Sequence, residues 1–300
     1  MEDLVKEFID ARRTDTEPIA ENTAKTYRVT LDKFMGYLSE QTDVTEWERV
    51  GKRHVRGFLA ALRDAGIAQN TLHMRHASLG AFFTWLVAEG EIKESPVKGV
   101  ARPKETIEPT PLVSEDTMHA LLKLEARTRF LTIRNRAILY LLWDGGVRIG
   151  ELLSITTNSV DMDAMTVKVN GKTGPRTVPF GTATSVALRR YLRARAKYPR
   201  SANRPELFLG HRGELKGNAV REMLKAYGSQ VGSPGLHPHQ FRHTWVHSML
   251  DNGATLKDLM ILGGWSSPQQ IIERYGLAGQ VERAFNAHRR LSPGDRLSAA

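Results

Sequence analysis

The residues of this chain that could do chemistry stand in four short stretches, all after residue 144. Arg148 and Glu151 form the first, directly after the pair Gly145-Gly146, where an apolar helix is expected to end and a new helix to begin. An arginine at such a helix start can be partly buried, and a glutamate three residues later can orient it. The same spacing also fits an ordinary surface ion pair, so both interpretations remain open at this stage.

The second stretch is a predicted β-hairpin with Lys172 at its tip. The alternating segment 165–170 and the segment 176–180 are expected to be short strands, and residues 171–174 form the turn between them. A lysine at a hairpin tip is usually just solvated. It can also reach into a neighbouring cleft and donate a proton.

The third stretch is a predicted helix with a polar face, which Pro238 suits as a first helical residue. His239 and Arg242 lie three residues apart and share that face, which His243 and His247 continue. Three histidines at i, i+4 and i+8 are also compatible with zinc, but no acidic ligand or HExxH pattern accompanies them. A His-hydrophobe-His nicking motif would need a strand, whereas a proline opens a helix here.

The fourth stretch contains Trp265 and Tyr275. Ser267 and Pro268 are typical of a helix start, and Gly276 is typical of a helix end, so Tyr275 is expected at the end of a short helix. A tyrosine that ends an apolar stripe is most often a core residue. Its meaning therefore depends on the other three stretches.

The elements that position these stretches are mostly helices. Residues 1–103 are predicted to be a helical domain and residues 104–113 a proline-containing linker, and residues 114–300 form a second domain. In the first domain, apolar periodicity predicts helices at 3–12, 22–38, 53–64 and 69–89. In the second domain it predicts a helix that starts at residue 114 and further helices at 137–143, 183–197 and 217–228. With a further short strand at 206–210, the fold class is mainly α with a small β-hairpin or sheet.

Composition restricts the possible functions. A net charge of +10 and a pI of about 9.9 favour a polyanionic partner such as nucleic acid. The chain has no cysteine, which excludes disulfides, thiolate catalysis and cysteine-ligated zinc. No apolar run is long enough to cross a bilayer and the N-terminus has no signal-peptide pattern, so we expect a cytoplasmic protein without a membrane partner.

The positive charge is unevenly distributed. Residues 1–100 hold 14 Lys and Arg against 16 Asp and Glu, so the excess lies in the second domain. Segment 51–80 is nevertheless basic, with five Lys and Arg and one acidic residue. The residues of the first domain that we predict to contact DNA phosphates are Lys25, Arg28, Lys52, Arg53, Arg56, His73, Arg75 and His76. A solvated helix face is the alternative interpretation.

In their order and context, the four stretches resemble the tyrosine recombinase (phage integrase) family. The residues that carry the resemblance are Arg148, Glu151, Lys172, His239, Arg242, Trp265 and Tyr275. The resemblance covers nearly the whole chain. It implies a SAM-like helical core-DNA-binding domain followed by a mixed α/β catalytic domain, and it implies the simple family type, without an arm-binding domain.

The resemblance also implies an enzyme that cleaves and rejoins DNA at specific sites. Tyr275 would attack the scissile phosphate and form a 3′-phosphotyrosine, while Arg148 and Arg242 would hold the non-bridging oxygens. Lys172 would protonate the leaving 5′ oxygen. Neither a metal nor another cofactor is then required. Integration or excision of a phage or mobile element is the expected use.

The remaining family residues would have supporting roles. His239 would assist proton transfer or hold the phosphate, Trp265 would donate its indole N–H to a phosphate oxygen, and Glu151 would fix Arg148. Lys168 and Arg176 are alternatives to Lys172 in the hairpin, and Arg176 is also a predicted DNA contact. Trp265 and Tyr275 are ten residues apart, where the family usually has nine.

The implied partners follow from the family. Two domains would clamp double-stranded DNA, and four protomers would assemble on two recombining sites, from a monomer or weak oligomer in solution. The tail helix after Tyr275 would dock on a neighbour or on its own domain. DNA-bending or directionality proteins would be accessory partners. The main alternative is a non-catalytic DNA-binding protein on the same fold; a metal-dependent nuclease and a type IB topoisomerase-like enzyme are further alternatives.

Overall fold

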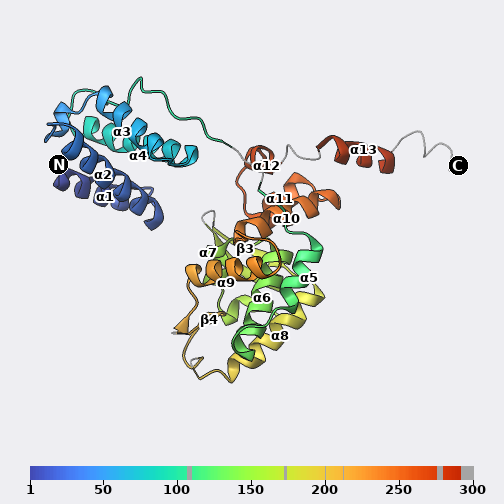
Figure 1. Ribbon diagram of the computed structural model, residues 1–300. Helices are drawn as coiled ribbons and strands as arrows, with labels where there is room; N and C mark the ends of the chain where they lie inside the picture. Colours follow the sequence, from blue (N-terminus) through green and yellow to red (C-terminus); the bar gives the residue numbers. More distant parts are fainter. Residues whose placement is uncertain (107–109, 172–173, 200, 212, 276–279, 292–300) are drawn as a thin grey trace. The chain divides into compact units, whose positions relative to one another are not determined.

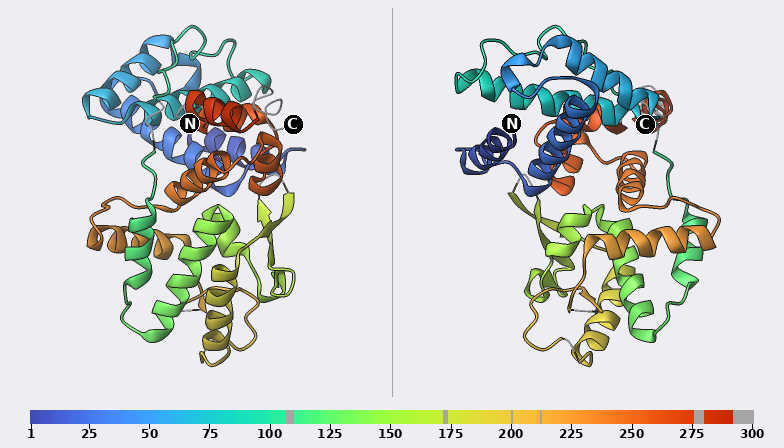
Figure 2. Two further views of the ribbon diagram at one scale, coloured as in Figure 1. Left: turned by 90° about the vertical axis from the view of Figure 1, so that its right-hand side faces the viewer. Right: turned by 60° about the vertical axis from the view of Figure 1, so that its left-hand side comes forward.

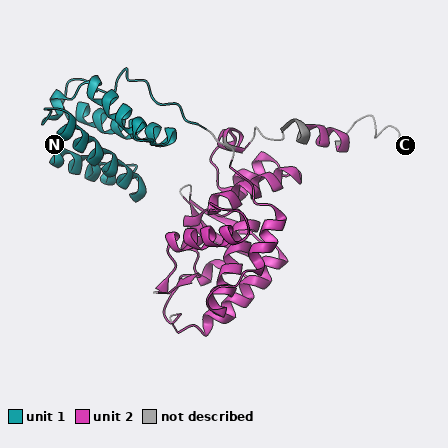
Figure 3. Ribbon diagram, viewed as in Figure 1, with its two compact units in different colours: residues 1–108 teal, residues 109–300 magenta. Residues whose placement is uncertain are grey.

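The computed structural model describes residues 1–300 except 107–109, 172–173, 200, 212, 276–279 and 292–300. The chain divides into two compact units, residues 1–108 and 109–300 (Figure 3). This division falls within the segment 104–113 that we predicted to be a linker. Within the described part of the chain, none of the helices combines the length and apolar character needed to span a bilayer.

Unit 1 is a helical module, as predicted (Figure 1). Its elements are α1 (Glu2–Thr14), α2 (Glu21–Gln41), the 3₁₀ turn η1 (Trp47–Arg49), α3 (Lys52–Asp64) and α4 (Gln69–Ala88). Aromatic rings dominate its core: Phe34, Phe82 and Phe83 are fully buried, and Trp47 packs edge-on against both Phe82 and Phe83. Burying such large rings gives this small unit a core of its own.

Unit 2 is also mainly helical, which confirms the predicted fold class. Its helices are α5 (Glu115–Lys123), α6 (Arg129–Gly145), α7 (Ile149–Ser154), η2 (Thr157–Ser159), α8 (Thr182–Ala196), α9 (Gly217–Gln230), α10 (Pro238–Asp251), α11 (Leu256–Gly263), α12 (Pro268–Tyr275) and α13 (Gln280–Leu291). The expected cap of α5 is present, since Ser114 Oγ accepts a hydrogen bond from Thr117 N at 3.1 Å. We did not predict α11, although its capping box of Thr255 and Asp258 is a sequence signal.

The strands of unit 2 are few and short. The predicted hairpin is confirmed as β2 (Thr166–Gly171) and β3 (Gly174–Pro179), which pair antiparallel, with β1 (Val160–Asp161) added beside β2. It lies at the edge of the helical body in both views of Figure 2. Its tip residues 172–173 are outside the described residues, and β2 and β3 pack against α7 and α11, respectively.

The strand predicted at 206–210 is largely wrong. Only β4 (Leu209–Gly210) forms there, paired with β5 (Gly213–Glu214). Glu206 makes only an isolated antiparallel bridge with Thr156. The guanidinium of the buried Arg195 takes the carbonyls of Glu206 and Leu207, which a regular strand would offer to its neighbour.

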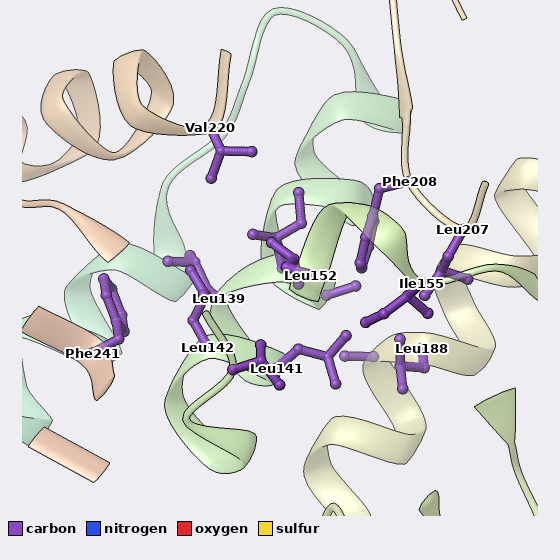
Figure 4. Packing of buried hydrophobic residues seen from close by; sticks show 14 of the residues in the cluster. Leu139, Leu141, Leu142, Leu152, Ile155, Leu188, Leu207, Phe208, Val220 and Phe241 are labelled. Atoms are coloured by element: carbon purple, nitrogen blue, oxygen red, sulfur yellow. The ribbon is translucent and has the colours of Figure 1, made fainter. Parts of the chain in front are cut away.

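The core of unit 2 holds the site-bearing elements together (Figure 4). Helix α6 is its centre, with Leu139, Leu141 and Leu142 fully buried between α8 and α10. Leu152 of α7 and Phe241 of α10 join the same cluster. The helices that carry the candidate site residues are thus anchored by burial of apolar surface.

The junction between α6 and α7 depends on a glycine. Gly146 ends α6 in the left-handed conformation, with φ of 54°. A Cβ atom at this position would lie 2.4 Å from ring atoms of Trp245 on α10. Both the backbone conformation and the close packing of α10 therefore require glycine here.

We expect Gly146→Ala to lower the free energy of unfolding by about 1–3 kcal/mol, because the methyl group forces a strained backbone and displaces Trp245. Urea unfolding of the full chain, followed by circular dichroism, measures the change. Gly150→Ala is the matched control, since no other group lies within 4 Å of a Cβ atom there. Equal stability of the two variants would contradict this account.

Candidate active site

The site begins at the N-terminus of α7. Arg148 is the residue before this helix, and its backbone N–H donates to Glu151 Oε2 at 2.7 Å. The carboxylate of Glu151 thus satisfies an N–H group that the helix itself leaves unpaired. Its side chain is only 2% exposed, whereas that of Arg148 is 38% exposed.

The guanidinium of Arg148 is held by three oxygens. Nη1 donates to Glu151 Oε1 at 3.0 Å and to the carbonyl of Gly263 at 3.1 Å, and Nη2 donates to the carbonyl of Gly264 at 3.4 Å. The last two belong to the end of α11, far along the chain. Arg148 therefore joins α7 to α11 while part of its surface remains open to solvent.

Arg242 approaches the same carbonyl from α10. Its Nη2 donates to the Gly263 carbonyl at 2.6 Å, and its Nη1 donates to the Gly146 carbonyl at 2.8 Å. Arg242 is only 2% exposed. Burial lowers the pKa of Arg242 to about 10, and the positive charge of Arg148 contributes to this shift. Two guanidiniums close together and mainly hydrogen-bonded to carbonyls provide a strong attraction for an anion.

Trp265 covers this pair of arginines. The Cζ atom of Arg242 lies 3.9 Å from the centroid of the Trp265 ring and that of Arg148 lies 5.6 Å away, so both are within cation–π range. The ring sits directly on Gly263, where a Cβ atom would lie 1.8 Å from Trp265 Cζ3. Glycine at 263 is thus a condition for this packing.

Tyr275 ends α12 and joins the same cluster. Its ring makes an edge contact with Trp265, with centroids 5.6 Å apart, and a tilted contact with His243, with centroids 4.5 Å apart. Tyr275 is 3% exposed. The structure therefore brings together Arg148, Arg242, Trp265 and Tyr275, which the sequence singled out from three separate stretches.

The histidine helix contributes two rings. His239 is exposed near the start of α10 and makes an edge contact with His243, with centroids 4.5 Å apart. His243 is buried and links His239 to Tyr275. The sequence analysis placed His243 on the polar face of this helix and weighed it as a zinc ligand, but did not predict the contact with Tyr275. The spacing of four residues between His239 and His243 was the available signal. Among the described residues, no three His, Asp or Glu side chains are placed to hold a metal ion.

The three cationic residues predicted in the hairpin differ in what the structure shows of them. Lys172, the predicted proton donor, lies outside the described residues. Lys168 is exposed on β2. Arg176, predicted as a DNA contact, instead directs its guanidinium at Glu151, with Nη2 3.1 Å from Oε2 and a side chain that is only 9% exposed.

The predicted DNA contacts of unit 1 fall into two groups. The exposed ones are Lys25, Lys52, Arg53 and Arg56. The others have partners within the unit: Arg28 pairs with Glu2 and Asp32, Arg75 donates to Thr30 Oγ1, His73 contacts the Pro103 carbonyl, and His76 contacts the Val100 carbonyl. The two histidines thus face the segment that follows α4, an arrangement that local spacing does not reveal.

Comparison with known sequences identifies the family. The profile of the phage integrase family matches residues 112–278, and that of the phage integrase N-terminal SAM-like domain matches residues 14–90. The chain belongs to the phage integrase family. The resemblance found in the sequence is thereby confirmed, and the described site lies in the part matched by the integrase profile.

Named relatives of this integrase-family chain agree with the assignment. It is 30% identical over 273 residues to the tyrosine recombinase XerC of Roseiflexus sp. (strain RS-1), covering 89% of this chain and 87% of that protein. It is also 30% identical over 274 residues to the tyrosine recombinase XerC of Haemophilus influenzae (strain ATCC 51907 / DSM 11121 / KW20 / Rd), covering 90% and 92% of the two chains.

Solved structures show the same fold at lower identity. The Tn1549 transposon integrase in complex with transposon right end DNA matches with a TM-score of 0.71 and 17% identity, covering 96% of this chain and 99% of that one. The XerH site-specific recombinase bound to a palindromic difH substrate matches with a TM-score of 0.72 and 19% identity, covering 94% and 83%. These likenesses establish the integrase-type fold of the chain.

We expect Glu151→Gln to lower the free energy of unfolding by about 3 kcal/mol, because it leaves the buried guanidinium of Arg176 without its carboxylate. Urea unfolding measures the loss. Glu214→Gln is the matched control, since Glu214 pairs with Lys216 on the surface, and we expect it to cost less than about 1 kcal/mol. Similar losses for the two variants would show that the buried pair of Glu151 and Arg176 stabilises the fold no more than a surface pair does.

Proposed function

We propose that this chain is a site-specific tyrosine recombinase, which cleaves and rejoins duplex DNA with Tyr275 as its nucleophile. The observation that supports this most directly is the convergence of Arg148 and Arg242 on the Gly263 carbonyl, with Trp265 packed between Arg242 and Tyr275. A phenol in the same cluster as two guanidiniums combines a nucleophile with groups that stabilise a phosphoryl transition state. Binding to DNA alone would not need this combination.

The proposed reaction conserves the number of phosphate ester bonds. The Tyr275 hydroxyl loses its proton as its oxygen attacks the scissile phosphorus, and the bond from phosphorus to the 5′ oxygen breaks. The products are a 3′-phosphotyrosine and a 5′-hydroxyl, which takes up a proton. Attack by the 5′-hydroxyl of another strand reverses these steps and rejoins the DNA, so no external energy source is needed.

We assign the supporting residues as follows. The partly exposed Arg148 and the buried Arg242 supply the two guanidiniums that hold the non-bridging oxygens. Lys172 protonates the leaving oxygen, and His239 assists proton transfer at the entrance of the site. Trp265 holds Arg242 in place and presents its indole N–H to the phosphate. These roles need neither a metal nor an organic cofactor.

The partner that follows from this chemistry is double-stranded DNA. In unit 1, the exposed cations Lys52, Arg53 and Arg56 occupy the first turns of α3 and are our candidates for phosphate contacts, together with Lys25 on α2. Recombination between two duplexes requires four strand cleavages. This number fits the proposed tetramer, in which each protomer supplies one nucleophile. Integration or excision of a mobile element is the proposed biological use.

We expect Tyr275→Phe to abolish covalent capture of DNA while leaving DNA binding within about twofold, because only the attacking oxygen is lost. The assay incubates the protein in EDTA with plasmid libraries that carry candidate sites, denatures it, and sequences the DNA that remains attached. Tyr227→Phe is the matched control, because Tyr227 is also buried but bonds to Asn135 away from the site. It should retain capture.

Two results would refute the nucleophile assignment. One is an adduct that persists in Tyr275→Phe, which would place the nucleophile elsewhere. The other is clear DNA binding without any adduct on a known recombination site, which would favour a non-catalytic DNA-binding protein on this fold. Loss of cleavage in EDTA alone would instead indicate a metal-dependent nuclease.

We expect the triple variant Lys52→Ala, Arg53→Ala, Arg56→Ala to weaken DNA binding and to reduce the slope of log K against log salt by about 3, since each phosphate contact contributes about one unit. Fluorescence anisotropy at several salt concentrations measures the slope. A second triple variant, at Lys6, Arg12 and Arg13 of α1, removes the same charge and should change the slope less. Equal slopes for both triples would mean that only net charge matters.

A further inference from the structure

Arg176 lies in this site without a role in the proposed reaction. We infer that it is a positioning residue, which fastens strand β3 of the hairpin to Glu151 and so to the start of α7. The inference rests on the proposed function, because it concerns the alignment of a proton donor carried by this hairpin. It assigns Arg176 neither a contact with DNA nor a direct part in the chemistry.

The carboxylate of Glu151 lies between two guanidiniums. Its Oε1 accepts from Arg148 Nη1 at 3.0 Å, and its Oε2 accepts from Arg176 Nη2 at 3.1 Å. The same Oε2 accepts from the Arg148 backbone N–H at 2.7 Å. One buried carboxylate therefore links the start of α7, the exposed arginine and strand β3.

The other strand of the hairpin also reaches this carboxylate. A Cβ atom on Gly171, the last residue of β2, would lie 2.7 Å from Glu151 Oε1. Gly171 pairs with Gly174, and Arg176 pairs with Val169 across the hairpin. Glu151 thus meets the hairpin on both strands, within a few residues of its tip.

Arg176 is not the side chain that would make the fold most stable at this position. Its Nε and Nη1 groups are buried and have no partner among the described residues. Burial is also the largest cause that lowers the pKa of Arg176, against the opposing charge of Glu151. Buried donors without partners destabilise a fold. Replacing Arg176 by an apolar side chain would remove them, and Glu151 would keep two N–H donors from Arg148. Stability therefore does not account for an arginine here, whereas a directional bond to Glu151 does.

The hydrogen bond between Arg176 and Glu151 is important because proton transfer requires close alignment of the donor with the leaving oxygen. A general acid must come within hydrogen-bond distance of the leaving oxygen, and a shift of about 1 Å can cost about 100-fold in rate. The proposed donor Lys172 directly follows Gly171 in the chain. Release of β3 from Glu151 would let the hairpin move. It would therefore impair protonation of the leaving group more than it impairs phosphate binding.

The test compares two leaving groups in Arg176→Met and Arg176→Lys. One substrate is a duplex that carries the recombination site recovered by covalent capture. The other has sulfur in place of the bridging 5′ oxygen at the scissile phosphate. A thiolate leaves without protonation near neutral pH, since a thiol has a pKa of about 8.5. Single-turnover cleavage is measured on both, with thermal unfolding of each variant.

We expect Arg176→Met to cleave the ordinary substrate about 100-fold more slowly than the wild type and the sulfur substrate within about threefold. Arg176→Lys should recover part of the loss, because its ammonium can still reach the carboxylate. The melting temperature of Arg176→Met should stay close to that of the wild type. Thr177→Val, a change at an exposed position next to Arg176 on the same strand, should leave both rates unchanged.

Two outcomes would overturn the inference. If Arg176→Met slows both substrates equally, the residue acts through the phosphate-binding arginines or the fold and does not align the proton donor. If it slows neither, Arg176 has no positioning role. Failure of the proposed function gives a different result, because the wild type itself would then form no adduct on either substrate.

Discussion

The carbonyl of Gly263 is the one acceptor on which the arrangement of the site depends. It receives N–H groups from both Arg148, at the start of α7, and Arg242, on α10. Gly263 is also the last residue of α11, so its carbonyl stands at the negative end of a helix dipole. That partial charge reduces the repulsion between the two neighbouring guanidiniums.

The surrounding packing follows from this acceptor. Because residue 263 has no side chain, the ring of Trp265 can fold back over Arg242 and lie against Tyr275. Gly146 has a similar role on the other side, where its carbonyl takes the second Arg242 bond and its bare Cα admits Trp245. The two glycines thus allow Arg242 to be buried with backbone carbonyls as its hydrogen-bond partners. No carboxylate pairs directly with its charge among the described residues.

The sequence predicted the helices of this fold well, because apolar periodicity and caps such as Ser114 are local signals. It also identified Arg148, Arg242, Trp265 and Tyr275 as candidate site residues, since their order is typical of a family. It did not predict that Gly263 accepts from both arginines, or that His243 contacts Tyr275. These contacts join elements distant in the chain, and no spacing rule specifies which face each element presents. Arg176 shows the limit most clearly: a strand arginine was expected to face DNA, yet a buried carboxylate 25 residues earlier determines its direction.

The burial of Tyr275 bears on how such an enzyme behaves amid the great excess of DNA that is not its target. A phenol that is 3% exposed between two rings offers almost no surface to a passing phosphodiester. In the proposed reaction, contact between Tyr275 and the scissile phosphorus requires part of that ring packing to be given up, which sets a free-energy threshold before any bond is broken. Weak, transient encounters with DNA would fall below this threshold, whereas a fully engaged site would exceed it. The packing that stabilises the fold would therefore also limit cleavage of DNA that is not the target.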